Sequence, residues 1–367
     1  MIKAPDHVLK VKAYVPGKPM EELERELGIK DPVKLASNEN PVGPSPLALE
    51  AVLSAAKKGI NRYPDGSGFY LKKKLSHILG TDPGGIILGN GSNEIIDIAA
   101  RTFLRPGDEA IMASPSFVVY SMSVTLQGAA AVEIPLDHNL RHDLPRMAQA
   151  VTPRTKMIFI ANPNNPTGTI NYRQEYDSFF AAIPEDVLVV IDEAYLEYVT
   201  NRDYPDSMSC LAGGKNVLIL RTFSKIYGLA GLRTGYGISH PEILGQMERV
   251  RAPFNSNSLG QAAAIRALDD EDHVKRSREV NEQGKEFLYG ELSALGYDYT
   301  PTEANFIYIR VSDPLGLFDA LLKEGVIIRP AGGDAVRVTI GLPEENKRFI
   351  HALKKTKTPA LEKDAGN

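Results

Sequence analysis

Cysteine, tryptophan and long apolar runs are what this sequence lacks. Its 367 residues include one cysteine, Cys210, and no tryptophan. A single cysteine excludes an intrachain disulfide and any zinc site made of cysteines alone. No apolar run approaches the roughly 18 residues of a membrane-spanning helix, and residues 1–19 lack the apolar core of a signal peptide. We therefore expect a cytoplasmic protein with no membrane partner.

The sequence also lacks a large excess of either charge. It has 42 Lys and Arg residues against 46 Asp and Glu residues, which gives a formal net charge of −4. A protein that binds nucleic acid through its phosphates needs a positive field, so we expect no nucleic-acid partner. The hydrophobic fraction of 43% and the charged fraction of 24% are typical of an ordinary globular protein.

Motifs of metal sites and of serine hydrolases are missing as well. His138 and His142 are the only histidines spaced four residues apart, and no glutamate completes an HExxH motif. Ser224 does not lie in a GxSxG motif. We therefore predict no metal site and no hydrolysis that depends on a serine nucleophile.

From residue 47 to residue 251, amphipathic helical stretches alternate with short apolar runs. This alternation is typical of an α/β fold with helices on both faces of a sheet, and the buried character of the runs favours mainly parallel strands. The expected strands are 85–88, 109–113, 130–134, 156–161, 187–192, 217–221 and 235–238, and the expected helices are 47–58, 69–79, 93–104, 117–127, 172–183 and 241–251.

The remaining segments indicate a second, smaller unit of α+β type. The first forty residues are rich in proline and are expected to be extended. Beyond them and the sheet we expect a helical stretch over 258–295, a strand within 304–311, a helix at 314–323 and short strands around Ile327 and Val338. The predicted units are an arm with part of the small domain at 1–45, a large domain at 46–252, a small C-terminal domain at 253–355 and a flexible tail at 356–367.

Polar residues follow several expected strands, at the edge where open α/β sheets bind ligands. In the loop at 162–168, Asn-Pro-Asn-Asn-Pro-Thr-Gly, two prolines would hold the Asn165 amide in a fixed direction, and a stiff turn is the alternative. Asp192 ends another strand and would lose solvation unless it met a cation or hydrogen-bond donors. Tyr195 follows in the next turn. A helix N-cap is the alternative role for Asp192.

Lys225 follows the strand at 217–221. A lone lysine there is usually solvated, but Lys225 comes after Thr222 and Ser224 and before Arg233. Glycines close to it in the sequence allow the backbone to approach a ligand. An amine beside hydroxyl groups and a guanidinium fits a phosphate-bearing aldehyde, because the amine attacks the aldehyde while Ser224 and Arg233 bind phosphate oxygens.

A further segment supplies a candidate anion site. The run Leu-Gly-Asn-Gly-Ser-Asn-Glu at 88–94 leads from a strand into an apolar-periodic helix. The backbone N–H groups of Ser92 and Asn93, just after Gly91, would bind a phosphate with the help of the helix dipole. The third glycine of a dinucleotide-binding fingerprint is missing, and a simple capped helix start is the alternative.

Together these motifs resemble those of the fold-type I aminotransferases that use pyridoxal 5′-phosphate (PLP), and above all those of the histidinol-phosphate aminotransferases. The resemblance covers nearly the whole chain. Its segments are Ala-Tyr-Val-Pro-Gly-Lys-Pro (13–19), Ser-Asn-Glu-Asn-Pro (37–41), Arg-Tyr-Pro-Asp (62–65), the 162–168 loop, Asp-Glu-Ala-Tyr (192–195), Ser-Lys (224–225), Gly-Leu-Arg-Thr-Gly (231–235) and Arg-Val-Thr-Ile-Gly (337–341). It implies a PLP-dependent enzyme of fold type I.

The resemblance also implies roles for single residues. Lys225 would bind PLP covalently and act as general acid and base, and Asp192 would pair with the ring nitrogen. Phe117 would stack on the ring; many relatives have tyrosine there, so the stacking remains and the hydroxyl is lost. The residues implied to bind the 3′-oxygen are Asn165 and Tyr195, and those implied to bind the phosphate are Gly91, Ser92, Asn93, Thr222, Ser224 and Arg233.

A homodimer with shared sites is implied too. Tyr63, within Arg-Tyr-Pro-Asp, matches the family residue that reaches the PLP phosphate of the neighbouring subunit. An ordinary half-buried core or interface tyrosine is the alternative reading of this position.

The implied substrates are L-histidinol phosphate and 2-oxoglutarate, in histidine biosynthesis. Arg329 and Arg337 would bind the carboxylate of glutamate or a phosphate, and Tyr14 would add a hydroxyl. Two other reactions stay open at this point. One is decarboxylation of a phosphorylated amino acid such as threonine phosphate, and the other is transamination of aromatic or branched-chain amino acids in general.

Overall fold

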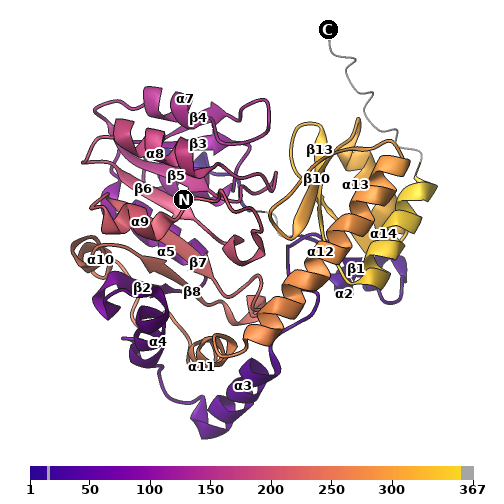
Figure 1. Cartoon of the computed structure of the whole chain (residues 1–367), viewed down its shortest axis with the longest axis horizontal. Helices are drawn as coiled ribbons and strands as arrows, with labels where there is room; N and C mark the ends of the chain where they lie inside the picture. The colour runs from indigo at the N-terminus through magenta and orange to yellow at the C-terminus, as the bar shows by residue number, and fades with distance from the viewer. Residues whose placement is uncertain (15–16, 357–367) are drawn as a thin grey trace.

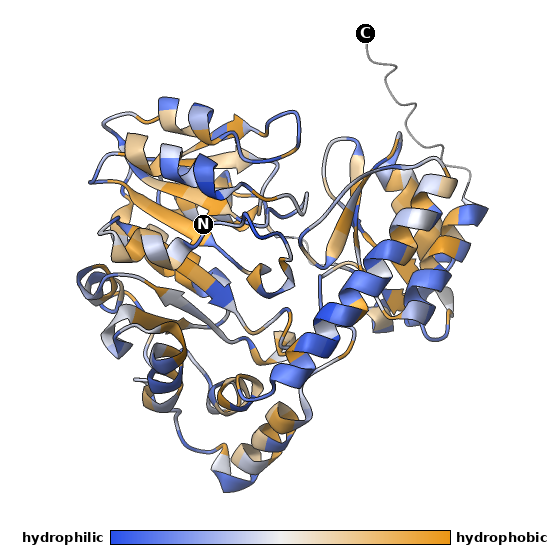
Figure 2. Cartoon of the chain, in the orientation of Figure 1, coloured by the Kyte–Doolittle hydropathy of each residue, from blue (hydrophilic) through white to orange (hydrophobic). Residues whose placement is uncertain are grey.

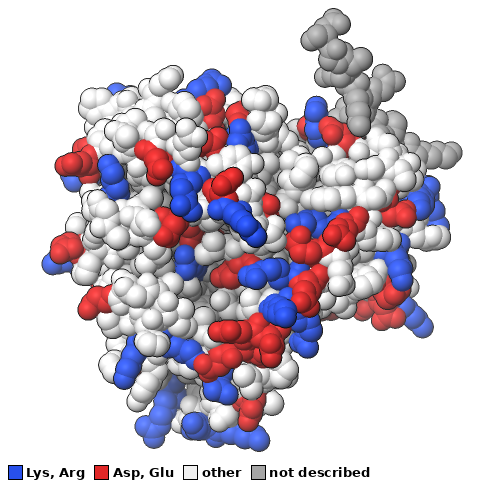
Figure 3. Space-filling model, viewed as in Figure 1, with Lys and Arg blue, Asp and Glu red and all other residues white. Residues whose placement is uncertain are grey.

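The computed structural model describes residues 1–14 and 17–356, and Figure 1 shows them as two lobes connected by the long helix α12 (Glu271–Ala294). No helix in these residues combines the length and the apolar character that a membrane span requires. On the face seen in Figure 3, Lys and Arg side chains are interspersed with Asp and Glu side chains. The division into units at 1–45, 46–252 and 253–355 stays a prediction.

The larger lobe is built around a seven-stranded sheet. Its order is β2-β8-β7-β6-β5-β3-β4, and every neighbouring pair is parallel except the two that involve β8. The strands are β2 (Ile86–Gly89), β3 (Glu109–Ser114), β4 (Ala130–Pro135), β5 (Thr155–Ala161), β6 (Leu188–Asp192), β7 (Val217–Thr222) and β8 (Gly235–Ile238). The prediction of an α/β fold with a mainly parallel sheet is therefore confirmed.

Helices cover both faces of this sheet, whose strands are strongly hydrophobic (Figure 2). Two separate clusters of buried side chains form, one on each face, because the strands carry apolar residues toward both sides. One face carries α3 (Pro46–Gly59), α4 (Phe69–Leu79), α7 (Leu144–Gln149), α8 (Arg173–Ala182), α9 (Ser207–Ala212) and α11 (Ser258–Ala267), and the other carries α5 (Ser92–Phe103), α6 (Val119–Leu126) and α10 (Pro241–Met247). Short 3-10 helices occur at η1 (Pro83–Gly85), η2 (Leu196–Tyr198) and η3 (Ala230–Leu232).

The smaller lobe holds a four-stranded antiparallel sheet of order β12-β13-β10-β9. Its strands are β9 (Asp298–Thr300), β10 (Phe306–Arg310), β12 (Arg329–Pro330) and β13 (Ala335–Thr339), and its helices are α12, α13 (Pro314–Lys323) and α14 (Pro343–Lys355). In addition, β1 (Val33–Lys34) pairs with β11 (Val326–Ile327) in parallel. The segment 20–34 therefore lies beside this lobe, where Figure 1 labels α2 (Met20–Leu27) and β1, whereas the N-terminus itself lies at the larger lobe.

Two expectations about local structure were wrong. The first forty residues are not extended throughout, because they form α1 (Asp6–Leu9) and α2 (Met20–Leu27), and Leu23 is buried against the smaller lobe. The helical stretch expected at 258–295 is two helices, and Asp270 caps the second by accepting a hydrogen bond from the His273 N–H. Helix α14 continues to Lys355, whereas most of the predicted tail at 356–367 lies outside the described residues.

Candidate active site

A cavity of about 590 Å³ lies at the carboxyl ends of the parallel strands, where β12 and β13 of the smaller lobe face them. Every site residue predicted from the sequence lines it, except Tyr63. These residues are Tyr14, Gly91, Ser92, Asn93, Phe117, Asn165, Asp192, Tyr195, Thr222, Ser224, Lys225, Arg233, Arg329 and Arg337. Segments that are far apart in the sequence thus converge on one cavity.

The register of the parallel strands brings the polar side chains together. Asp192 ends β6 and pairs with the end of β5, from which the loop with Asn165 continues. Thr222 ends β7, the neighbour of β6 on its other side, and Lys225 follows three positions later. Because the carboxyl ends of parallel strands meet at one edge, the loops that follow them reach the same space.

Asp192 is a buried carboxylate held by hydrogen bonds. The Tyr120 hydroxyl and the Ala194 N–H donate to its two oxygens. Burial raises the pKa of Asp192 to about 6, and the two hydrogen bonds oppose this rise. Above that pH, the carboxylate is charged and is suited to hold a proton on a ring nitrogen.

The half-buried Lys225 places its amine in the cavity, close to positively charged side chains. Its Nζ donates a hydrogen bond to the Ser37 carbonyl oxygen over 3.0 Å and lies 5.5 Å from the centre of the Tyr195 ring. Burial, together with the positive charges of Arg337 and Arg233, lowers the pKa of Lys225 to about 7. At neutral pH a large part of this lysine is therefore uncharged, and only an uncharged amine attacks a carbonyl carbon or accepts a proton.

The start of α5 and the Arg233 side chain form an anion site. Helix α5 begins at Ser92, so its first N–H groups have no acceptor within the helix, and the helix dipole favours an anion. The Arg233 Nη1 lies 3.4 Å from the Ser224 hydroxyl. Gly91 has a φ of 79°, and a Cβ there would lie 2.7 Å from the Arg233 Nη2. Glycine at this position therefore lets the guanidinium approach α5, and the resulting donors fit a phosphate.

Two arginines lie side by side on the smaller lobe. Arg329 of β12 is the register partner of Arg337 on β13. Arg337 donates to the Ala36 carbonyl oxygen over 2.6 Å and to the Asn165 side-chain oxygen, whereas its Nε is buried without a hydrogen-bond partner in the described chain. Burial lowers the pKa of Arg337, and Arg329 adds to this effect. A bound anion would offset the repulsion between the two guanidinium groups.

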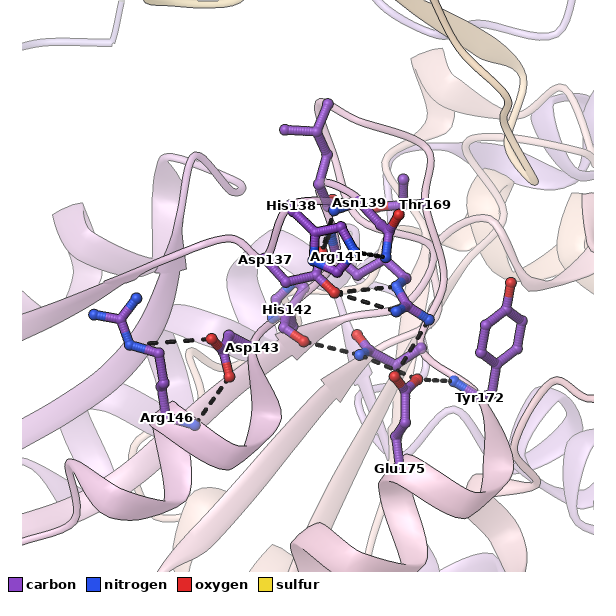
Figure 4. A network of polar contacts seen from close by, with 12 residues as sticks. Asp137, His138, Asn139, Arg141, His142, Asp143, Arg146, Thr169, Tyr172 and Glu175 are labelled. Atoms are coloured by element: carbon purple, nitrogen blue, oxygen red, sulfur yellow. Dashed lines mark hydrogen bonds and ion pairs between the residues drawn. The ribbon is translucent and has the colours of Figure 1, made fainter. Parts of the chain in front are cut away.

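Residues 137–142 contact the segment that follows the loop carrying Asn165. The Thr169 hydroxyl donates to the Leu140 carbonyl oxygen over 2.6 Å, and Figure 4 shows Thr169 beside this segment. Arg141 pairs with Asp137 and with Glu175, each at 3.2 Å. Glu175 belongs to α8, which directly follows the loop. These ion pairs connect the segment 137–142 to α8, on either side of the residues that follow the loop.

His142 continues this support toward the cavity. Its Nε2 lies 3.2 Å from the Asn164 side-chain oxygen, and burial lowers the pKa of His142 to about 4, so the ring is neutral. The Ser116 hydroxyl donates to the same oxygen over 2.9 Å. Since Ser116 precedes Phe117, the Asn164 side-chain oxygen connects the loop to the start of the Phe117 segment.

Comparison with known proteins agrees with this geometry. Residues 30–353, most of the chain, match the family described as aminotransferase class I and II. The chain belongs to this family. It is 51% identical to a histidinol-phosphate aminotransferase of Moorella thermoacetica, over 96% of this chain and 92% of that protein. It is 49% identical to histidinol-phosphate aminotransferase 1 of Nitrosococcus oceani, over 93% of each.

Solved structures resemble this aminotransferase chain in the same way. The histidinol-phosphate aminotransferase of Sinorhizobium meliloti, solved in complex with pyridoxal-5′-phosphate, has a TM-score of 0.88 and 29% identity, over 94% of this chain and 95% of that one. The aspartate aminotransferase of Thermus thermophilus with maleate has a TM-score of 0.84 at 22% identity, which shows a shared fold. The prediction of fold type I is confirmed.

Tyr63 is the predicted site residue that this aminotransferase chain does not bring to its own cavity. The side chain is 82% exposed, and its ring stacks on Phe254 with centroids 4.7 Å apart and 20° between the planes. Tyr63 is therefore not a core residue of the single chain, and the alternative of an ordinary interface tyrosine stays open. An exposed aromatic pair is available to a partner molecule.

The aminotransferase structure also places in the cavity Ser37, Asn38 and Tyr120, whose contacts were not predicted from the sequence. Asn38 donates to the Tyr195 hydroxyl over 2.9 Å and has a φ of 56°. Asparagine tolerates this left-handed conformation better than most residues, so its place in the Ser-Asn-Glu-Asn-Pro segment was a signal that could have been used. Tyr120 carried no comparable signal, because a tyrosine in a helix is usually a packing residue.

Proposed function

We propose that this chain transfers the amino group between L-histidinol phosphate and 2-oxoglutarate, giving imidazole acetol phosphate and glutamate, as a cytoplasmic enzyme of histidine biosynthesis. The relatives at 51% and 49% identity bear the name histidinol-phosphate aminotransferase. Their names support this reaction over decarboxylation of threonine phosphate and over general aromatic or branched-chain transamination. The observation that carries the proposal is that one cavity contains the Lys225 amine and two separate arginine sites.

The two arginine sites match the two anions that the reaction must hold. Arg233, with Ser224 and the start of α5, suits the phosphate of the cofactor. Arg329 and Arg337 are left for the substrate. A guanidinium group binds a carboxylate or a phosphate through two parallel hydrogen bonds, so the same pair serves the phosphate of histidinol phosphate and a carboxylate of 2-oxoglutarate in turn.

The cavity residues fit PLP. The donors around Gly91 suit its phosphate, Asp192 suits its ring nitrogen, and the uncharged amine of Lys225 suits its aldehyde. We assign the remaining contacts to Phe117 as the stacking ring, to Asn165 and Tyr195 at the 3′-oxygen, and to Ser92, Asn93 and Thr222 at the phosphate. When bound, PLP supplies an electron-accepting ring that stabilises the charge on the substrate carbon after its proton leaves.

The protein residues divide the remaining work. The Lys225 amine would take the proton from the substrate carbon and deliver it to the cofactor carbon, which requires a pKa near the working pH. Asp192, ionised above about pH 6, keeps the ring nitrogen protonated. Arg337 orients the substrate through its anion, so that the proton to be removed lies within reach of Lys225.

Purified protein loaded with PLP tests the proposal. We expect glutamate to form from 2-oxoglutarate faster with L-histidinol phosphate than with phenylalanine or leucine, because only the first amine offers a phosphate to the arginine pair. Release of CO₂ from threonine phosphate is measured in parallel. Faster turnover of phenylalanine or leucine, or stoichiometric release of CO₂, would contradict the proposed substrate.

We also propose a homodimer with shared active sites. Exposed apolar side chains gather on α3, α4 and the segment between them, and Tyr63 lies among them. They are Leu49, Leu53, Ile60, Phe69 and Tyr70, together with Phe254 against Tyr63. A second copy of the chain would cover this surface, since isologous dimers are the commonest oligomers. Tyr63 would then bind the cofactor phosphate in the partner's cavity.

A further inference from the structure

Two donors from different elements hold the carboxylate of Asp192. The Tyr120 hydroxyl, on α6, donates to Oδ2 over 2.8 Å, and the Ala194 N–H donates to Oδ1 over 3.1 Å. Asp192 is 5% exposed and Tyr120 is 1% exposed, so both side chains are shielded from bulk water. An ionised carboxylate accepts about four hydrogen bonds, which leaves acceptor positions on Asp192 for a ligand in the cavity.

Tyr120 is itself held by aromatic packing. Its ring stacks on Phe159 of β5, with centroids 4.8 Å apart and 13° between the planes. Phe117 meets the same ring edge on, at 5.5 Å and 86°. A side chain packed on two sides in a dense core keeps one rotamer, so its hydroxyl stays directed at Asp192. Phe117, assigned to cofactor stacking, and Asp192, assigned to the ring nitrogen, therefore both contact Tyr120.

We propose that Tyr120 is a positioning residue for the cofactor: its hydroxyl fixes the orientation of the Asp192 carboxylate and favours its ionised form. Tyr120 acts through Asp192 and needs no contact of its own with the cofactor. The inference rests on the proposed function, because that function gives Asp192 the ring nitrogen of PLP as its partner.

The electrostatic surroundings of Asp192 explain why this hydroxyl matters. Burial favours the protonated carboxyl and Glu193 acts in the same direction, whereas Tyr120, the Ala194 N–H and Lys225 favour the charged form. The hydrogen bond from Tyr120 is the largest of the effects that oppose burial. Tyr195 also faces Asp192, and burial raises the pKa of its hydroxyl, so it stays neutral. Without the Tyr120 hydroxyl, Asp192 would keep its proton to a higher pH.

Binding of pyridoxamine 5′-phosphate provides the test. Tyr120→Phe and its parent are compared in a Lys225→Ala background, where neither a covalent bond nor the titration of Lys225 contributes. Calorimetry gives the Kd at intervals between pH 5 and pH 8. We expect the pH below which binding weakens to rise by about one unit in Tyr120→Phe, which makes the Kd about tenfold larger on that limb of the profile.

A matched control separates this effect from the loss of any buried hydroxyl. Tyr176→Phe removes the hydroxyl of a tyrosine that is also 1% exposed but lies on the opposite face of the sheet. We expect its binding profile to coincide with that of the parent. Far-ultraviolet circular dichroism and thermal unfolding establish that each variant is folded.

A double-mutant cycle with Asp192→Asn shows whether Tyr120 acts through Asp192. In an Asp192→Asn background the residue has no carboxyl proton to lose, so Tyr120→Phe should produce no further pH shift. A shift that persists there, or a Tyr120→Phe profile that coincides with the Tyr176→Phe profile, would overturn the inference. If the Lys225→Ala parent itself does not bind pyridoxamine 5′-phosphate, the proposed function fails instead.

Discussion

Arg337 of the smaller lobe donates a hydrogen bond to the side-chain oxygen of Asn165 on the larger lobe. The same loop meets the smaller lobe again at its end, where the Glu303 N–H donates to the Gly168 carbonyl oxygen over 2.8 Å. A Cβ at residue 168 would lie 2.0 Å from the Thr302 hydroxyl, so a side chain there would push the lobes apart. The proposed substrate site and cofactor site are therefore joined through one loop.

Lys225→Ala should abolish transamination while the protein stays folded. The side chain is half-buried and its amine makes one hydrogen bond to a backbone carbonyl, so its loss removes the proposed chemistry rather than part of the core. Borohydride reduction of the native protein with PLP, followed by peptide mapping, identifies the modified lysine. A label on any other lysine would show that the assignment is wrong.

Replacing the two arginines one at a time should affect the two half-reactions to different extents. Arg337→Gln should lower kcat/KM for both substrates, because both present an anion to this residue. Arg329→Gln and Tyr14→Phe should impair the reaction of histidinol phosphate more than that of glutamate. Each lost charge-assisted hydrogen bond would cost about 1.5 to 3 kcal/mol, or roughly ten- to a hundredfold in kcat/KM.

Arg310→Gln is the matched control for this series, since Arg310 lies on the neighbouring strand β10 and does not line the cavity. We expect its kinetic constants for both substrates to equal those of the native enzyme. Equal effects of Arg329→Gln on both half-reactions would remove the distinction drawn between Arg329 and Arg337.

Much of the larger lobe could be predicted from the sequence, because buried apolar runs define its strands. The strand expected at 187–192 is found at Leu188–Asp192, and the helix expected at 69–79 has those bounds. The N-terminal segment could not be predicted in the same way. Strand β1 consists of two residues and exists only because it pairs with β11 across nearly the whole chain length. Such long-range pairing leaves no local pattern.

The part of the site that could be predicted from the sequence consists of charged side chains that lie within motifs. Asp192, Lys225 and Arg233 carry charges in positions where a solvated role was hard to justify, and all three line the cavity. The acceptor for Lys225 is a backbone carbonyl 188 residues earlier in the chain. Every residue has such a carbonyl, so the residue types in the sequence do not indicate this contact. Tyr120 was missed for a similar reason, because its contact with Asp192 depends on how α6 packs over β5.

Mixing two inactive variants should restore activity if Tyr63 completes the partner's site. A Tyr63→Ala chain keeps Lys225, and a Lys225→Ala chain keeps Tyr63, so one of the two cavities in a mixed dimer receives both intact residues. We expect the activity of an exchanged mixture to approach a quarter of the native value. Native mass spectrometry of differently tagged chains verifies exchange. Exchange without any return of activity would contradict the shared-site model.

The free energy of unfolding of PLP-free Asp192→Asn, measured relative to that of the PLP-free native protein, should increase as the pH rises. The pKa of Asp192 is raised from 3.8 to about 6 in the folded state, so between these values the folded protein binds more protons than the unfolded chain. The free energy of unfolding of the native protein therefore falls as the pH rises through this window, and the contribution stays lost above it. Asparagine does not titrate, and its side-chain oxygen can still accept a hydrogen bond from Tyr120.

Urea unfolding at pH 4 and pH 7.5 measures this effect, with each variant compared to the native chain at the same pH. The difference in unfolding free energy between Asp192→Asn and native protein should be about 2 kcal/mol more favourable to the variant at pH 7.5 than at pH 4. Asp186→Asn, which changes a carboxyl with 74% of its side chain exposed, provides the baseline for replacing any aspartate. A difference for Asp192→Asn that does not change with pH beyond this baseline would mean that Asp192 is not protonated more readily in the folded protein, and the burial argument for its pKa would be wrong.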